Sequence, residues 1–184
     1  MHEGDDASSP VLSACCSLEF DLKSSGIDFE PFQEIWNADH SRAWLREWAG
    51  GADHDESSDT FRIFGRDRSG GCAALWIRNP SLSLDEQPIV CFESEGKSHL
   101  VAQNAKNFLW LLASGVGPLE AVRSLRPDYE AKPHRKAHKA ALRLAGDAKK
   151  SARDIVLSAS GLLLTDFSAV VDQMSKRNKK AKLL

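Results

Sequence analysis

The chain contains 184 residues, of which 42% are hydrophobic and 27% are charged, and these proportions are typical of a soluble globular protein. Its apolar runs, such as residues 108–113, are shorter than the roughly 20 residues that a membrane-spanning helix needs. The start, MHEGDD, is acidic where a signal peptide is basic. We therefore expect a cytoplasmic protein with no membrane partner.

The charges are divided unevenly along the chain. Residues 1–130 contain 11 Lys and Arg against 22 Asp and Glu, a balance of −11, whereas residues 131–184 contain 13 against 4, a balance of +9. The sequence therefore predicts an acidic body and a basic tail. We expect three parts, a mobile N-terminal segment (1–28), an α+β domain (29–130) and a basic helical extension packed on that domain (131–184).

The sequence of the first quarter of the chain predicts few helices and strands. Residues 1–28 are rich in Ser, Asp and Gly, and they indicate one short strand at residues 16–22. Residues 29–36 place apolar side chains at helical spacing, with Pro31 in the first turn. Asp39 is then in a position to cap a second helix, which ends at the Gly50–Gly51 pair.

The middle of the chain predicts a sheet. Four apolar stretches bounded by Gly, Ser, Asn and Pro have the composition of strands, and the last two are close enough to form a hairpin; they are residues 61–65, 73–78, 88–92 and 98–102. Asn104 then caps a helix that ends at Gly115, and Pro118 opens a short helical turn. The fold class is therefore α+β, a mostly antiparallel sheet flanked by helices.

The tail has the apolar periodicity of packed helices. We expect helices over residues 136–145, 152–160 and 166–176. The four cysteines are expected to be free and largely buried thiols, because Cys15 and Cys16 are adjacent and Cys72 and Cys91 lie in apolar runs. The five tryptophans are expected to pack in the core.

The stretch FRIFGRDRSGGCAALW, residues 61–76, concentrates glycine between two apolar runs. A dinucleotide-binding loop requires G-x-G-x-x-G between a strand and a helix, because the helix N-terminus holds the pyrophosphate. Here a strand follows, and the Gly-Lys-Ser/Thr of a phosphate-binding loop is absent. The glycines are typical of a tight turn between two strands.

The order of these signals resembles the SUKH superfamily, which is named after the Smi/Knr cell-wall regulators and consists mainly of bacterial immunity proteins. The resemblance covers about residues 29–124 and lies in the pattern of strands and turns. The matching positions are Phe64, Gly65, Asp67, Gly70, Gly71, Pro88, Val90, Glu95, Gly96, Phe108 and Leu109. The resemblance implies an α+β fold and a binding protein, most often the antidote to a toxin, of which many are nucleases.

The acidic body agrees with such a partner, because a nuclease is usually basic and negative charge steers it to its inhibitor. We expect a non-catalytic protein that contacts its toxin through acidic side chains. The proposed contacts are Asp53, Asp55, Glu56, Asp59, Asp67, Glu93 and Glu95. We expect no cofactor. Two alternatives stay open, a regulatory scaffold for a cellular enzyme and a hydrolase that uses Glu93 and Glu95 on one face of a strand.

Two other kinds of site are disfavoured by their surroundings. His134 and His138 have the spacing of two zinc ligands on a helix, but Arg135, Lys136 and Lys139 crowd them with positive charge. We therefore expect no metal site. The basic tail has almost no aromatic residue for base stacking and no recognised nucleic-acid-binding motif, so direct nucleic-acid binding is not expected.

Overall fold

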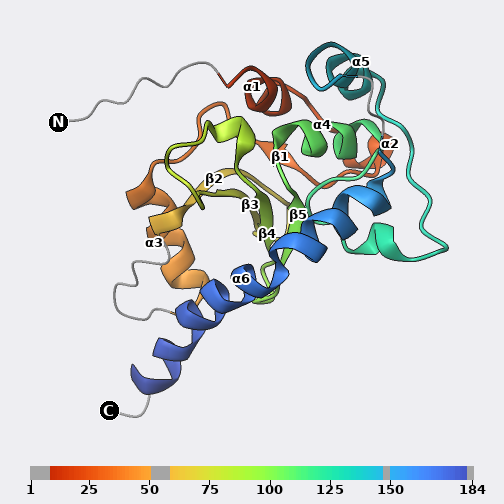
Figure 1. The fold of residues 1–184 in the computed structure, drawn as a ribbon. Coiled ribbons are helices and arrows are strands. Elements are labelled where there is room, and N and C mark those ends of the chain that lie inside the picture. Colours follow the sequence, from red (N-terminus) through yellow and green to blue (C-terminus); the bar gives the residue numbers. More distant parts are fainter. Residues whose placement is uncertain (1–8, 51–58, 147–149, 182–184) are drawn as a thin grey trace.

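The computed structural model describes residues 9–50, 59–146 and 150–181, with side chains as far as Met174. It contains a five-stranded sheet in the order β1-β2-β3-β4-β5, in which each neighbouring pair is antiparallel (Figure 1). The strands are β1 (Glu30–Pro31), β2 (Phe61–Arg66), β3 (Cys72–Trp76), β4 (Ile89–Phe92) and β5 (Ser98–Ala102). The fold is α+β, as predicted.

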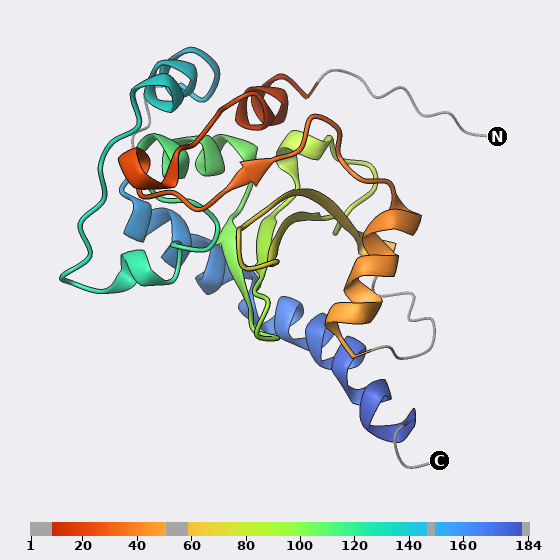
Figure 2. The same ribbon diagram turned by 180° about the vertical axis from the view of Figure 1, so that it is seen from behind.

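Helices cover both faces of the sheet (Figures 1 and 2). They are α1 (Pro10–Cys16), α2 (Leu22–Ser25), α3 (Ala38–Trp48), α4 (Ala105–Ala113), α5 (Arg135–Leu144) and α6 (Ala152–Ala181), with 3₁₀ turns η2 (Leu84–Glu86) and η3 (Arg123–Leu125). One face packs with α1, α4 and α5 into a first core cluster, and the other packs with α3 and most of α6 into a second cluster.

The central strands show why the sheet is covered on both sides. Every residue of β3 and β4 is buried. Along β3, Ala73 and Leu75 face the first cluster, whereas Cys72, Ala74 and Trp76 face the second. Strands buried on both faces carry continuous apolar runs instead of alternating ones, which is the pattern of residues 72–76 and 89–92.

The N-terminal segment differs from the prediction, because residues 16–22 form no strand and the preceding residues form helix α1. One face of α1 packs into the first cluster through Val11, Leu12 and Cys15. The carboxylate of Asp85 accepts hydrogen bonds from the backbone N–H groups of Val11, at 3.2 Å, and Leu12, at 2.8 Å. It thereby satisfies donors that the first turn of a helix leaves open. Val11, Leu12, Cys15 and Leu18 are therefore part of the core.

Residues 29–36 also differ from the predicted helix. Glu30 and Pro31 form the edge strand β1, and beyond it the N–H groups of Phe32 and Trp36 each donate to a carbonyl of β2 at 2.8 Å. Pairing with β2 thus replaces the local helical pattern. Helix α3 begins after Asn37, whose side chain caps it by accepting from the N–H of His40, and not at Asp39.

The hairpins and the α4 cap follow the prediction. Residues 67–71 form the turn between β2 and β3, and β4 pairs with β5. Asn104 caps α4 by accepting from the N–H of Asn107 at 2.9 Å, and Gly115 ends the helix region with a positive φ of 83°. The four cysteines are free, with three buried. Burial raises the pKa of the Cys72 thiol to about 12 and that of Cys16 to about 11.

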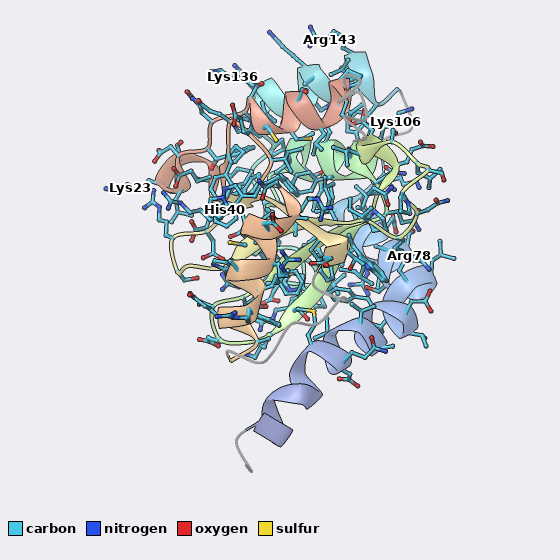
Figure 3. The ribbon with its side chains drawn as sticks, turned by 90° about the vertical axis from the view of Figure 1, so that its left-hand side faces the viewer. Lys23, His40, Arg78, Lys106, Lys136 and Arg143 are labelled. Carbon is cyan, nitrogen blue, oxygen red and sulfur yellow. The ribbon has the colours of Figure 1, made fainter. Side chains whose placement is uncertain are left out.

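In the described part of the tail two helices replace the three predicted ones, because residues 152–181 form the single helix α6. At 1.5 Å per residue its length is about 45 Å, and its C-terminal end extends past the body (Figure 2). Helix α5 packs through Ala137 and Ala141, whereas its basic side chains are exposed, among them Lys136 and Arg143 (Figure 3). The packing of α5 therefore depends on its alanines and not on its charges.

Two glycines allow a test of how tightly the β2–β3 turn packs compared with the surface of α6. A Cβ on Gly71 would lie 2.3 Å from Asp67 Oδ2 and 2.7 Å from the Phe92 carbonyl oxygen, whereas a Cβ on Gly161, within α6, would meet nothing within 4 Å. Gly71→Ala is expected to destabilise the fold by about 1–3 kcal/mol. Gly161→Ala is expected to stabilise it by about 0.5–1 kcal/mol. Urea unfolding of both variants measures the difference, and equal effects would contradict the packing of the β2–β3 turn.

Candidate protein-binding surface

The structure separates the seven predicted contact residues. Asp53, Asp55 and Glu56 belong to residues 51–58, which lie outside the described residues. Asp59 follows that segment, two residues before β2 begins at Phe61, and Asp67 lies in the β2–β3 turn. Glu93 and Glu95 lie in the turn between β4 and β5. The four described residues each have a partner within the chain.

Asp59 belongs to a network of charges at the edge of α3. Arg42 donates to Asp59 at 2.6 Å and also forms an ion pair with Asp39. Arg62 donates to the backbone carbonyl of Asp59 at 2.6 Å. Burial lowers the pKa of the Arg62 guanidinium, and the negative charges of Asp59 and Asp39 oppose that shift. The carboxylate of Asp59 therefore lies among compensating cations.

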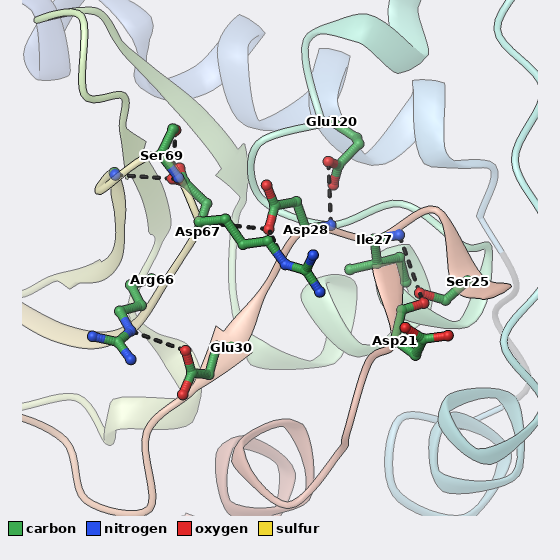
Figure 4. Close-up of polar contacts among 11 residues, drawn as sticks. Asp21, Ser25, Ile27, Asp28, Glu30, Arg66, Asp67, Ser69 and Glu120 are labelled. Atoms are coloured by element: carbon green, nitrogen blue, oxygen red, sulfur yellow. Dashed lines mark hydrogen bonds and ion pairs between the residues drawn. The ribbon is translucent and has the colours of Figure 1, made fainter. Parts of the chain in front are cut away.

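Asp67 has a structural role instead of the predicted contact role, because it is only 7% exposed. Its Oδ1 accepts from the N–H of Ser69 at 2.8 Å, the hydroxyl of Ser69 at 2.6 Å and the N–H of Gly71 at 3.0 Å (Figure 4). An aspartate that bonds its own backbone in this way fixes a turn. We therefore remove Asp67 from the candidate contacts.

The predicted pairing of Glu93 with Glu95 on one strand face is also wrong, because β4 ends at Phe92. The carboxylate of Glu93 lies 3.3 Å from His99 Nδ1, whereas Glu95 is exposed and lies 3.5 Å from Lys97 Nζ. His99 Nε2 lies 2.9 Å from the Pro118 carbonyl oxygen. Burial lowers the pKa of His99, against the opposing influence of Pro118 and Glu93. The hydrolase alternative thus loses the paired arrangement on which it depended.

A groove of about 880 Å³ runs beside this turn, and Glu120 is its most buried acid. Glu120 Oε1 accepts from the N–H of Asp28 at 3.3 Å, and Oε2 has no hydrogen-bond partner and packs against Gly117 (Figure 4). Burial raises the pKa of Glu120. This carboxyl holds the loop after α4 to the segment that leads into β1.

The structure reveals an aromatic row whose three tryptophans were predicted to lie in the core. The row consists of every fourth residue from Phe32 to Trp48, namely Phe32, Trp36, His40, Trp44 and Trp48. His40 is exposed, and the other four are half-buried at the edge of the second cluster. Trp76 and Trp110, in contrast, are buried as predicted.

The outer end of this aromatic row is a stack of rings. Phe32 and Trp36 stack with centroids 5.0 Å apart, and Trp36 and His40 stack at 4.5 Å. Figure 3 shows His40 at the N-terminal part of α3. Trp48 at the inner end packs edge-on against Phe92, and its indole N–H donates to the Glu93 carbonyl at 2.7 Å. Rigid, half-exposed aromatic rings of this kind are typical anchors of protein interfaces.

A second groove, of about 1160 Å³, lies beside this stack and between α1 and residues 29–37. Trp36, Ile35 and Phe20 give it apolar walls, and Glu34 and Arg62 add charge. Grooves with apolar walls and a few polar groups favour ligand or side-chain binding. The spacing of four was visible in the sequence, but its partial exposure was not, because exposure depends on how α3 lies against the sheet.

Metal binding receives no support from the predicted histidine pair. His134 caps α5 by accepting from the N–H of Ala137 at 3.3 Å, and His138 packs edge-on against Trp110. Among the described residues, no group of three or more His, Cys, Asp and Glu side chains is placed to hold a metal ion.

Comparisons with known proteins add no assignment, because no family model, no curated protein and no solved structure matches this chain.

The buried carboxyl of Glu120 predicts a pH dependence of stability. Its pKa is raised in the folded state above the ordinary value of 4.5, so its contribution is fully present below pH 4.5 and is lost as pH rises through the folded pKa. Glu120→Gln is expected to flatten the decline above pH 4.5. Urea unfolding across pH measures this slope, with the exposed Glu95→Gln as control. An unchanged slope in Glu120→Gln would contradict the prediction.

Proposed function

We propose that this chain is a non-catalytic protein-binding domain of the immunity type, which neutralises a basic, nuclease-type toxin by direct binding. The binding surface consists of the aromatic row, which runs from Phe32 to Trp48, and the acidic residues of the segment that follows α3. The single observation that carries the proposal is the half-exposed stack of Phe32, Trp36 and His40 beside a large groove. The resemblance of residues 29–124 to the SUKH superfamily supports the same function.

The two parts of this surface have different physical roles. Aromatic side chains bury a large area at a low cost in conformational entropy, so they supply affinity. Asp53, Asp55 and Glu56 follow α3 in the sequence, and negative charge at this position steers a cationic partner towards the aromatic row. The described acids Asp59, Glu93 and Glu95 have partners within the chain, so they contribute less to steering.

Identification of the partner is the first experiment. The full chain is expressed in its native host and purified with its bound proteins, which are then identified by mass spectrometry. A basic toxin as the main partner supports the immunity function, whereas a cellular enzyme supports the regulatory scaffold. The purified partner then allows the two parts of the surface to be measured separately.

Reversal of the acidic charges should slow association. The triple variant Asp53→Lys, Asp55→Lys, Glu56→Lys is expected to lower the association rate about tenfold at low ionic strength and to flatten its salt dependence. Asp128→Lys, at an exposed acid in another part of the molecule, is the matched control. Stopped-flow mixing at several salt concentrations measures both. The steering role fails if the triple variant keeps the salt dependence of the unmodified protein.

Removal of the aromatic anchor should instead accelerate dissociation. Trp36→Ala is expected to weaken binding by about 2 kcal/mol or more, roughly 30-fold, mainly through the dissociation rate. Because Trp36 is half-buried, thermal unfolding checks that the variant is folded, and His40→Ala removes an exposed ring of the same stack as a second variant. Surface plasmon resonance that finds both variants unchanged would remove the aromatic row from the interface.

A further inference from the structure

The groove beside the β4–β5 turn, of about 880 Å³, contains no residue of the aromatic row. Its walls are α2, the β2–β3 and β4–β5 turns and the loop that follows α4, which includes η3. Its volume lies within the range of small-molecule sites, roughly 300–1,000 Å³. The lining contains charged side chains of both signs, so the ligand that it favours depends on which charges already have partners.

The acids of this groove are mostly engaged within the chain. Among the described lining residues, only Glu95 and Glu130 are exposed acids. Glu95 pairs with Lys97 at 3.5 Å, and the half-buried Asp28 pairs with Arg68 at 3.9 Å. Glu130 is therefore the single exposed acid of the described lining that forms no ion pair.

The cations of the same groove are mostly unengaged. Four exposed cations in the lining form no ion pair with any described residue, namely Lys23, Arg123, Arg126 and Lys132. Cations of one sign that gather in a concave site raise the local concentration of anions. Four unpaired positive charges face one unpaired negative charge at the rim, so the groove favours an anionic ligand.

Arg123 and Arg126 leave the same side of a turn that is held in place. They are three residues apart across η3, and side chains at this spacing eclipse in a 3₁₀ turn. The N–H of Arg126 donates to the carbonyl of Arg123 at 3.0 Å. The carbonyl of Leu125 accepts from Arg153 of α6 at 2.6 Å. Helix α6 thus fixes the turn that presents both guanidinium groups.

The backbone at Lys132 is fixed at the end of the same loop. A Cβ on Gly115 would lie 2.0 Å from the carbonyl oxygen of Lys132, so the two backbones are in close contact. Two residues later, the N–H of His134 donates to the carbonyl of Ala113 at 3.0 Å. The loop is therefore anchored at η3 and at Lys132. A binding surface that is ordered before the ligand arrives loses less entropy on binding.

Apolar and aromatic side chains lie beside these cations in the groove. Tyr129 and Leu119 are half-buried, and Val122 is 44% exposed. Burial and the nearby Glu120 raise the pKa of the Tyr129 hydroxyl, and the positive charge of Arg123 opposes them. The tyrosine ring therefore lies near the Arg123 guanidinium. A ligand that joins an apolar or planar part to an anionic group would contact both kinds of side chain.

The cations also indicate which anion fits. A guanidinium group binds two oxygens of a carboxylate or a phosphate. A carboxylate carries one negative charge, whereas a phosphate group carries about two at neutral pH and so matches several cations. Nucleic acid requires cations that follow its backbone, but the β4–β5 turn adds Glu93 and Glu95 to this lining. A small phosphate compound is therefore the best match.

We propose that this groove binds a small organic phosphate, with its phosphate groups on Arg123, Arg126 and Lys132 and its apolar or planar part against Tyr129 and Val122. No phosphate-binding motif marks these residues in the sequence, because the loop after α4 brings them to the groove. The proposal is independent of toxin binding, since no residue of the aromatic row lines the groove.

Isothermal titration calorimetry of the full chain at low ionic strength tests the ligand class with pyrophosphate, ADP and succinate. Pyrophosphate is expected to bind, and ADP is expected to bind about tenfold more tightly, because its planar base adds an aromatic contact. Absence of binding by both phosphates overturns the proposal. Succinate that binds as tightly as pyrophosphate overturns the choice of phosphate, and equal affinities for ADP and pyrophosphate remove Tyr129 and Val122 from the site.

Paired variants locate the bound phosphate. Arg123→Gln with Arg126→Gln is expected to weaken pyrophosphate binding about tenfold or more. Lys136→Gln with Arg143→Gln removes two exposed cations of α5 (Figure 3) and is the matched control, which should bind like the unmodified protein. Thermal unfolding checks that both variants are folded. The groove is excluded as the site if the arginine variant keeps full affinity, or if both variants lose affinity equally.

A third variant tests the other end of the loop. Lys132→Gln removes one exposed cation and leaves the backbone contact with Gly115 in place. It is expected to weaken pyrophosphate binding several-fold, less than the paired arginine variant does. Unchanged affinity in Lys132→Gln would remove Lys132 from the proposed phosphate contacts.

Discussion

The central strands β3 and β4 are buried on both faces, and this constraint shapes the rest of the molecule. A sheet that is apolar on both sides must be covered on both sides. Helix α4, with α1 and α5 packed against it, covers one side, and α3 and most of α6 cover the other. The N-terminal helix and the tail are therefore required by the sheet. Arg78, which pairs with Asp166, adds a contact between the sheet region and α6.

Polar contacts join the β2–β3 turn, the segment before β1 and the loop after α4 at one edge of the sheet. Asp67 holds the β2–β3 turn, the carboxylate of Asp28 accepts from the N–H of Arg68 at 3.2 Å, and Glu120 accepts from the N–H of Asp28 (Figure 4). Three segments far apart in the sequence are thus joined by carboxylates that sit close to backbone donors. These acids contribute to the charge of the body, but their contacts are internal. Net charge alone therefore overstates the acidic surface that a partner can reach.

The proposed binding surface lies on α3 and on the residues that lead into it, beside the second face of the sheet. Helix α3 presents half-exposed aromatic rings because only one side of it reaches the sheet. These rings lie at the margin of the second core cluster. Such positions are ambiguous in a sequence, since buried and docking residues share the same chemistry.

The sequence by itself determined the features that depend on neighbouring residues. The β2–β3 turn, the β4–β5 hairpin and the cap at Asn104 follow from glycine, β-branched runs and a side-chain oxygen placed before a helix. Only the tertiary structure decided that residues 32–36 pair with β2, that Asp67 is buried and that α1 enters the core. It also decided which tryptophans stay half-exposed. Local patterns cannot decide these outcomes, because each depends on a contact with a segment distant in the chain whose position the fold alone fixes.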